Sequence, residues 1–204
     1  MTEIAGRAGV AAGTLYYHFG SKEELFVEVF RAAAMRELRA MREAGTAPAP
    51  WAARLEAVIE TFAGRALRSP RLAWALLYEP VDALVDAERL AFRRRYRAGM
   101  ARLLREGVDA GVIPPQDATL SAAGVVGAIA EALVGPLSAR GARGGGRSRD
   151  EQTVAGIVRF CGRAIGLDDE EDSDDRALRD RWPGGRRDDR PARGRERDRS
   201  ADGG

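Results

Sequence analysis

The first 26 residues constrain the fold of this chain more than any other segment. Ile4 and Ala8 have the spacing of one helical face, and Gly9 offers the positive φ that a tight turn between helices requires. Beyond the turn, Leu15 and Phe19 repeat at i and i+4, which predicts a second short helix. The segment therefore predicts a helix-turn-helix unit.

Polar side chains lie off the apolar face of the second predicted helix. Their hydroxyl groups and a ring nitrogen suit contacts to phosphates and to the edges of DNA bases. The sequence therefore predicts an outward surface formed by Thr14, Tyr16, Tyr17 and His18.

A third helix follows directly. Ser21 and Glu24 have the spacing of a capping box, in which the serine hydroxyl accepts from the Glu24 amide and Glu24 accepts from the serine amide. The apolar residues beyond it predict a long helix that connects the DNA-reading unit to a larger body. They are Leu25, Phe26, Val29, Phe30 and Ala33.

These residues resemble the TetR/AcrR family of bacterial transcriptional regulators. The likeness runs from about Thr2 to Phe26, with Ala-Gly-Val, Gly-Thr-Leu-Tyr-Tyr-His-Phe and Ser-Lys-Glu-Glu-Leu in the family's order and spacing. It implies a homodimer whose two recognition helices enter successive major grooves of double-stranded DNA, and which a small ligand in the helical body releases. It also implies base contacts by Ala12, Gly13 and Tyr16, and phosphate contacts by Thr14, Tyr17, His18 and Lys22.

The chain departs from the family pattern in three places. Ala11 stands where a serine usually caps the recognition helix, and losing such a cap costs about 1 kcal/mol. Ala12 replaces a side chain that is often polar or basic. The family's DNA-binding domain also opens with a further helix, whereas this chain begins inside the second one. We therefore expect the true start to lie upstream of Met1.

Composition narrows the function classes. The chain has 45% hydrophobic and 31% charged residues and no uninterrupted apolar stretch of 18 residues. It also lacks the pattern of a secretory signal peptide, in which basic residues precede an apolar segment. These features predict a cytoplasmic protein with no membrane partner. With one cysteine and one histidine, His18 on the recognition helix, the sequence predicts no metal, no cofactor and no enzymatic activity.

The chain divides into three parts. Residues 45–50, rich in proline and small residues, read as a linker, and the apolar stripes beyond them are helical. The predicted fold is all-α: a helix-turn-helix DNA-binding domain (1–47), truncated at its N-terminus, and a helical ligand-binding and dimerisation domain (48–167). Residues 168–204, with mixed charges and net charge −3, predict a disordered tail, or alternatively an arginine-rich arm on DNA phosphates.

Aromatic and thioether side chains in the second domain suit an apolar or aromatic effector. Residues 71–80 also resemble the start of the ligand-binding body in many members of the family. The alternative is that these side chains only fill the core. The candidate pocket residues are Trp74, Tyr78, Phe92, Tyr96 and Met100.

Two helices near the end of the second domain, at 118–137 and about 150–166, combine small and apolar residues on more than one face. The family resemblance implies that they form a dimer interface, and the alternative is that they only close the core of the monomer. Residues 141–149 between them predict a flexible loop. The candidate interface residues are Ala123, Gly127, Leu133, Val154, Ile157 and Cys161.

The predicted function is repression by occlusion of a palindromic operator, with release when a ligand stabilises a wider spacing of the recognition helices.

Residues 1–47 hold six acidic and six basic side chains, so charge alone does not predict DNA binding. The alternative is a protein that does not bind DNA and acts through mixed dimers with intact relatives.

Overall fold

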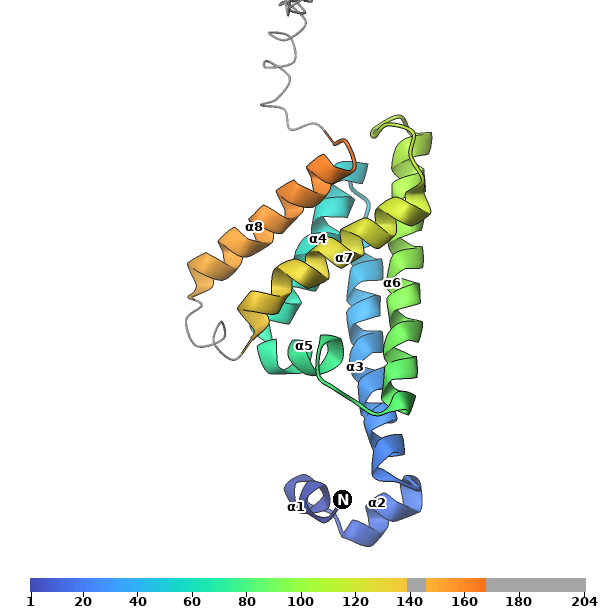
Figure 1. The fold of residues 1–204 in the computed structure, drawn as a ribbon, viewed down its shortest axis with the longest axis vertical. Coiled ribbons are helices and arrows are strands. Elements are labelled where there is room, and N and C mark those ends of the chain that lie inside the picture. The colour runs from blue at the N-terminus through green and yellow to red at the C-terminus, as the bar shows by residue number, and fades with distance from the viewer. Residues whose placement is uncertain (139–145, 168–204) are drawn as a thin grey trace, which may run out of the picture. The chain divides into compact units, whose positions relative to one another are not determined.

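The computed structural model describes residues 1–138 and 146–167. The predicted tail, 168–204, and residues 139–145 lie outside the described residues. All regular secondary structure in the described part is helical, which confirms the predicted fold class (Figure 1). The helices are α1 (Thr2–Ala8), α2 (Ala12–His18), α3 (Lys22–Gly45), α4 (Trp51–Arg68), α5 (Pro70–Leu77), α6 (Ala83–Asp109), α7 (Ala118–Leu137) and α8 (Arg147–Ala164).

The turn between α1 and α2 has the predicted geometry. Gly9 ends α1 with φ 70°, a left-handed conformation that glycine adopts without steric cost. The amide of Val10 then donates to the carbonyl of Ala5 at 3.0 Å. Ala11 precedes α2 without a side-chain cap, as the missing serine predicts. We call residues 1–21 the head and the remaining described residues the body.

The cap of α3 differs from the prediction in one bond. The Glu24 amide donates to Ser21 Oγ at 3.1 Å, as expected. However, the Glu24 carboxylate accepts from the Gly20 amide at 2.9 Å instead of from the Ser21 amide. Ser21 is extended (φ −146°, ψ 169°), which brings the amide before it within reach of the carboxylate. The cap therefore joins α3 to the loop that follows α2.

The body packs around α3, α4 and α6. In Figure 1, α3 and α6 run side by side, α7 crosses them, and α8 lies beside α4 and α7. Asp82 and Asp117 cap α6 and α7 by accepting from backbone amides at 2.8–3.2 Å. The core joins these helices, and its most buried large side chains are Leu55, Ile59, Leu104, Leu133 and Cys161.

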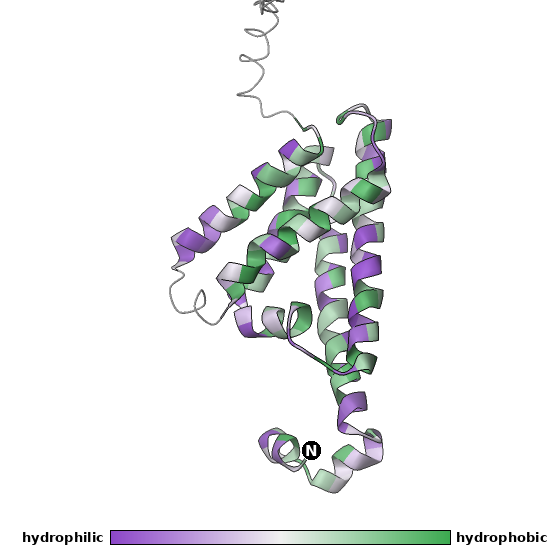
Figure 2. Ribbon diagram, viewed as in Figure 1, coloured by the Kyte–Doolittle hydropathy of each residue, from purple (hydrophilic) through white to green (hydrophobic). Residues whose placement is uncertain are grey.

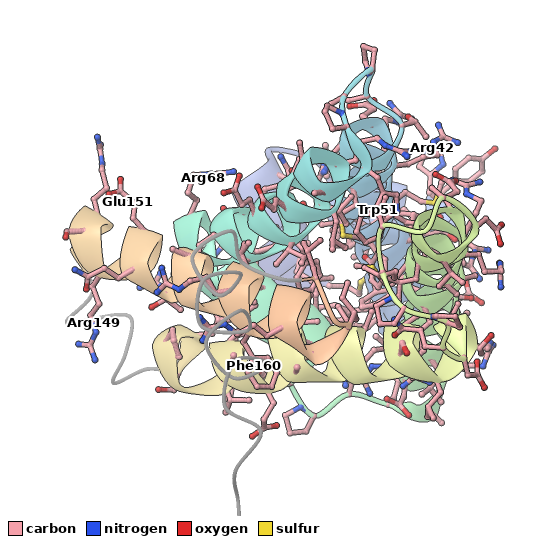
Figure 3. The ribbon with its side chains drawn as sticks, turned by 90° about the horizontal axis from the view of Figure 1, so that it is seen from above. Arg42, Trp51, Arg68, Arg149, Glu151 and Phe160 are labelled. Carbon is pink, nitrogen blue, oxygen red and sulfur yellow. The ribbon has the colours of Figure 1, made fainter. Side chains whose placement is uncertain are left out.

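Trp51, the first residue of α4, fixes that helix against α6. Its indole Nε1 donates to the carbonyl of Leu103 at 2.7 Å in a buried contact. A Cβ at Gly107 would lie 2.5 Å from the indole ring, so only glycine fits there. Figure 3 shows Trp51 between the helices, well inside the body.

Helix α7 is apolar along its length (Figure 2) and is long enough to cross a membrane by length and composition. Its mean hydropathy over the tested window is 1.7, and 33% of that window is buried within the protomer. Val125, Ile129 and Leu133 belong to the core. The absence of a membrane partner stays a prediction.

Helix α8 begins earlier than the sequence predicts. The amides of Arg149 and Asp150 donate to the carbonyl of Gly146 at 2.9 and 3.2 Å, so the first helical turn includes Arg147. The C-terminal part of the loop predicted at 141–149 is therefore helical.

Candidate functional site

Helix α2 presents the predicted DNA-facing side chains. No residue of this seven-residue helix is buried. Tyr17 is 86% exposed and Tyr16 is 56% exposed, and the Tyr17 ring contacts the His18 ring edge-on at 5.1 Å. Thr14 and Gly13 are exposed and Ala12 is half-buried. The hydroxyl and imidazole groups are thus free to meet phosphates and base edges.

Lys22 adds a positive charge beside α2. It is the first residue of α3, its side chain is exposed, and its Nζ lies 5.4 Å from the centre of the Phe26 ring. A cation at this end of a helix, together with the free amides there, favours a bound anion such as a phosphate. Across the turn, Arg7 is neutralised by Glu3 at 2.9 Å.

Apolar side chains near the head remain in contact with solvent. Val10 is 41% exposed, Phe26 is 46% exposed and Val29 is 54% exposed. Each exposed large side chain forgoes about 1.5–3 kcal/mol that full burial would contribute. The head therefore has little hydrophobic stabilisation of its own.

A cavity of about 400 Å³ lies in the body among α3, α4, α6 and α7. This volume falls within the usual range for small-molecule sites, about 300–1,000 Å³. Most of its lining is apolar, which suits a hydrocarbon or aromatic ligand. The apolar lining includes Met35, Leu38, Met41, Val58, Phe62, Met100, Leu103, Val126 and Ile129.

Arginines form part of the lining of this first cavity. Arg39, Arg42, Arg95 and Arg102 line it and are exposed, and Figure 3 shows Arg42 at the outer edge of the body. Glu106 also lines it, but its carboxylate is paired with Arg54 at 2.9 Å. The lining therefore carries a net positive charge. The sequence pattern did not identify these residues, although Arg39 and Arg42 share a helical face with the apolar lining of α3.

A second, smaller cavity of about 220 Å³ lies among α3, α4, α5, α6 and α7. Phe62, Tyr96 and Val126 line both cavities. The Tyr96 hydroxyl donates to the carbonyl of Ala34 on α3 at 3.4 Å. Burial raises the pKa of Tyr96 well above its usual value, and Glu37 adds to the increase, so the hydroxyl keeps its proton.

The structure brings three of the five predicted pocket residues to these cavities. Phe92 lines the second, Met100 the first and Tyr96 both. Trp74 and Tyr78 line neither. Their rings pack together with centroids 5.1 Å apart, and the Tyr78 hydroxyl donates to the Ala130 carbonyl on α7. The pair therefore links the end of α5 to α7.

The predicted interface residues divide into two groups. Leu133, Ile157 and Cys161 are buried within the protomer, where they close the core. Gly127 is exposed and Ala123 and Val154 are half-buried. The large apolar side chains that these two helices leave open are Leu120, 71% exposed, and Phe160, 61% exposed.

Nucleophiles and metal ligands are sparse in the described residues. Burial raises the pKa of the Cys161 thiol to about 11, so it stays protonated near neutral pH. Residues 1–138 and 146–167 hold no group of three or more His, Cys, Asp and Glu side chains suited to a metal ion.

Two parts of the sequence match known families of proteins and domains. Residues 1–29 match the family of bacterial regulatory proteins called the tetR family, and residues 48–133 match the tetracyclin repressor-like C-terminal domain. No curated protein matches the chain in sequence.

Solved structures share the fold at low sequence identity. The regulator FadR from Bacillus subtilis in complex with stearoyl-CoA has a TM-score of 0.70 and 20% identity, over 80% of this chain and 87% of that one. FadR from Bacillus halodurans, a fatty acid degradation regulator, has a TM-score of 0.67 and 19% identity, over 78% and 85%. A TetR/AcrR regulator from Thermobifida fusca has a TM-score of 0.61 and 23% identity, over 78% and 83%.

The matched segments cover both the helix-turn-helix unit and most of the helical body. Transcriptional regulators, not enzymes, make up the family that these segments define. The chain belongs to the TetR/AcrR family of DNA-binding transcriptional regulators.

Proposed function

We propose that this protein is a ligand-responsive repressor that binds a palindromic operator as a homodimer and leaves it when an effector enters the body. The observation that carries the proposal is the double role of α3. Its first residue, Lys22, lies beside α2, and residues 35–45 of the same helix line the first cavity. A ligand that shifts α3 therefore moves the recognition helix.

The proposed division of labour follows this helix. Residues 1–47 bind DNA in the cytoplasm through Ala12, Gly13, Thr14, Tyr16, Tyr17, His18 and Lys22. Residues 48–167 bind the second subunit and, together with residues 35–45 of α3, the effector. Two recognition helices then engage half-sites about one helical turn apart, roughly 34–36 Å.

The lining of the first cavity supports an amphiphilic effector with an apolar chain and an anionic group. Apolar side chains form most of the lining, and the exposed Arg39, Arg42 and Arg102 are also part of it. Guanidinium groups bind phosphates and carboxylates in a bidentate geometry. A similar fold, that of FadR from Bacillus subtilis, has been solved with stearoyl-CoA. We therefore propose a fatty acyl thioester as the effector class.

Gel shifts with the full chain and its own upstream DNA test the DNA-binding role. Tyr16→Ala and Tyr17→Ala each remove an exposed side chain of α2, so both should abolish the shift without changing the dimer in sedimentation. Undiminished binding by both variants would refute the contact assignment.

A second candidate function is a dimerising protein that does not hold DNA and acts through mixed dimers. The packing of the head favours it, because Ala5 is the one buried residue of α1 and α2 and Val10 between these helices is 41% exposed, so the head is weakly stabilised. The same gel shift separates the two candidates. No shift at low salt from a chain that still dimerises supports mixed dimers, and a specific shift excludes them.

A further inference from the structure

Two aromatic rings separate the two cavities of the body. Phe62 on α4 and Tyr96 on α6 line both cavities, and their ring centroids lie 6.0 Å apart in an edge-to-face arrangement. Val126 on α7 is the third shared residue. The division therefore depends on side chains, not on backbone.

The contacts that hold this division are weak. The Tyr96 hydroxyl reaches the carbonyl of Ala34 only at 3.4 Å, beyond the usual 2.5–3.0 Å for a hydroxyl donor. No ion pair in the described residues involves either ring. Rotation of the Tyr96 ring would break one long hydrogen bond, one ring contact and part of its packing against the cluster that contains Phe30 and Phe92, and it would connect the cavities.

The two volumes suit different roles. The first cavity, at about 400 Å³, has the size of an independent ligand site, whereas the second, at about 220 Å³, falls below that range. The second cavity is therefore better suited to the far end of a ligand that enters through the first. Its walls include Phe30 and Ala34 on α3, near the head.

We propose that Phe62 and Tyr96 form a gate that sets the effector's length. A short apolar chain fills the first cavity and stops at the two rings. A longer chain displaces the Tyr96 ring and enters the second cavity between α3 and α6. This inference rests on the proposed function of the first cavity as the effector site.

The second cavity also borders a contact that joins α3 to α4. Arg65 donates from Nε and Nη2 to the two carboxylate oxygens of Glu37, at 2.6 and 2.9 Å, and both residues line this cavity. A chain that reaches the second cavity thus meets the bidentate pair that positions α3. Long ligands therefore contact α3 at this pair as well as at the residues of α3 that line the first cavity.

Calorimetric titration of the full chain with octanoyl-CoA and stearoyl-CoA tests the gate. Phe62→Ala removes one ring of the gate and should raise the preference for stearoyl-CoA over octanoyl-CoA, the ratio of the two dissociation constants, at least fivefold. The ratio is the readout because Phe62 also lines the first cavity, where both probes bind. Tyr96→Phe keeps the ring but removes the bond to Ala34, and should shift stearoyl-CoA in the same direction by a smaller factor. It is the milder variant if Phe62→Ala fails to fold.

Leu76→Trp provides the matched change beyond the gate. Leu76 lines only the second cavity, so a larger side chain there should weaken stearoyl-CoA at least fivefold and leave octanoyl-CoA unchanged. If both probes bind but shift in parallel in every variant, the gate is wrong and the effector site stands. If the wild-type chain binds neither probe, the proposed effector class fails, and the gate fails with it.

Discussion

The head and the body of this protein are stabilised in different ways. Within α1 and α2, both fully described, Ala5 is the single buried residue, whereas α4 alone buries six. The head is shaped by local features, such as the left-handed Gly9 and the cap at Ser21. The body is shaped by contacts between helices far apart in sequence. DNA recognition thus depends on a thinly packed unit attached to a well-packed one.

The largest expected effect is a loss of stability, measured at one leucine in the body and one in the head. Leu104 is 0% exposed in the core, and Leu104→Ala should lower the free energy of unfolding by about 2–5 kcal/mol. Leu15 on α2 is only half-buried, so Leu15→Ala should cost less than about 1.5 kcal/mol. Urea denaturation followed by circular dichroism measures both. Equal losses would show that the head shares the body's cooperative core.

The next test concerns apolar side chains that the protomer leaves open. Phe160 on α8 is 61% exposed, and α8 packs against the apolar helix α7. Phe160→Arg should raise the dimer dissociation constant about 30-fold or more, as expected for an interface anchor worth about 2 kcal/mol. Leu84 on α6 is 59% exposed and serves as the control.

Sedimentation equilibrium separates the outcomes of these two variants. A dimer that weakens only with Phe160→Arg supports an interface formed by α7 and α8. Equal weakening by Leu84→Arg would indicate that exposure alone, not position, decides the effect. No change with either variant would place the interface elsewhere.

A smaller effect is expected at the contact between α4 and α6. Glycine to alanine in a helix ordinarily stabilises it by about 0.5–1 kcal/mol. At Gly107 the new Cβ would lie 2.5 Å from the Trp51 ring, so Gly107→Ala should instead destabilise the body by about 1–3 kcal/mol. Gly99→Ala, on the same helix with nothing within 4 Å, is the control and should be neutral or stabilising. Thermal unfolding of both variants gives the sign.

The same division explains what could be predicted from sequence. The turn at Gly9 and the cap at Ser21 are encoded within a few residues, so local spacing predicts them. The pocket could not be predicted as well, because its lining depends on how helices rotate against one another. Tyr96 and Tyr78 look alike in sequence, yet Tyr96 lies between two cavities and Tyr78 donates to α7.

The arginines at the first cavity were missed for a related reason. A helix with many arginines normally has a solvated face, and the sequence around Tyr96 on α6 suggests one. In the structure Arg95 lines the first cavity and Arg93 the second, and Arg102 on α6 lines the same cavity as Arg39 and Arg42 on α3. The spacing of charged residues along one helix does not show which other helix will pack against it.

The smallest predicted effect compares two helix caps. Ser21 and Asp82 each accept from a backbone amide at the start of a helix, α3 and α6, at 2.8–3.2 Å. Ser21→Ala and Asp82→Ala should therefore each cost about 1 kcal/mol. The two losses of stability should affect different parts of the protein. Because the Ser21 cap adjoins Lys22 and the loop after α2, its loss should loosen the head and weaken operator binding, while Asp82→Ala leaves binding unchanged.

Amide hydrogen exchange of the two variants locates that cost. With Ser21→Ala, faster exchange should be confined to α2 and the first turn of α3, because few tertiary contacts hold the head in place. With Asp82→Ala, faster exchange should stay at the start of α6, next to a core that retains its protection. If Ser21→Ala instead accelerated exchange throughout the body, the head would be part of the same folding unit, and the weak packing of α1 and α2 would not isolate it.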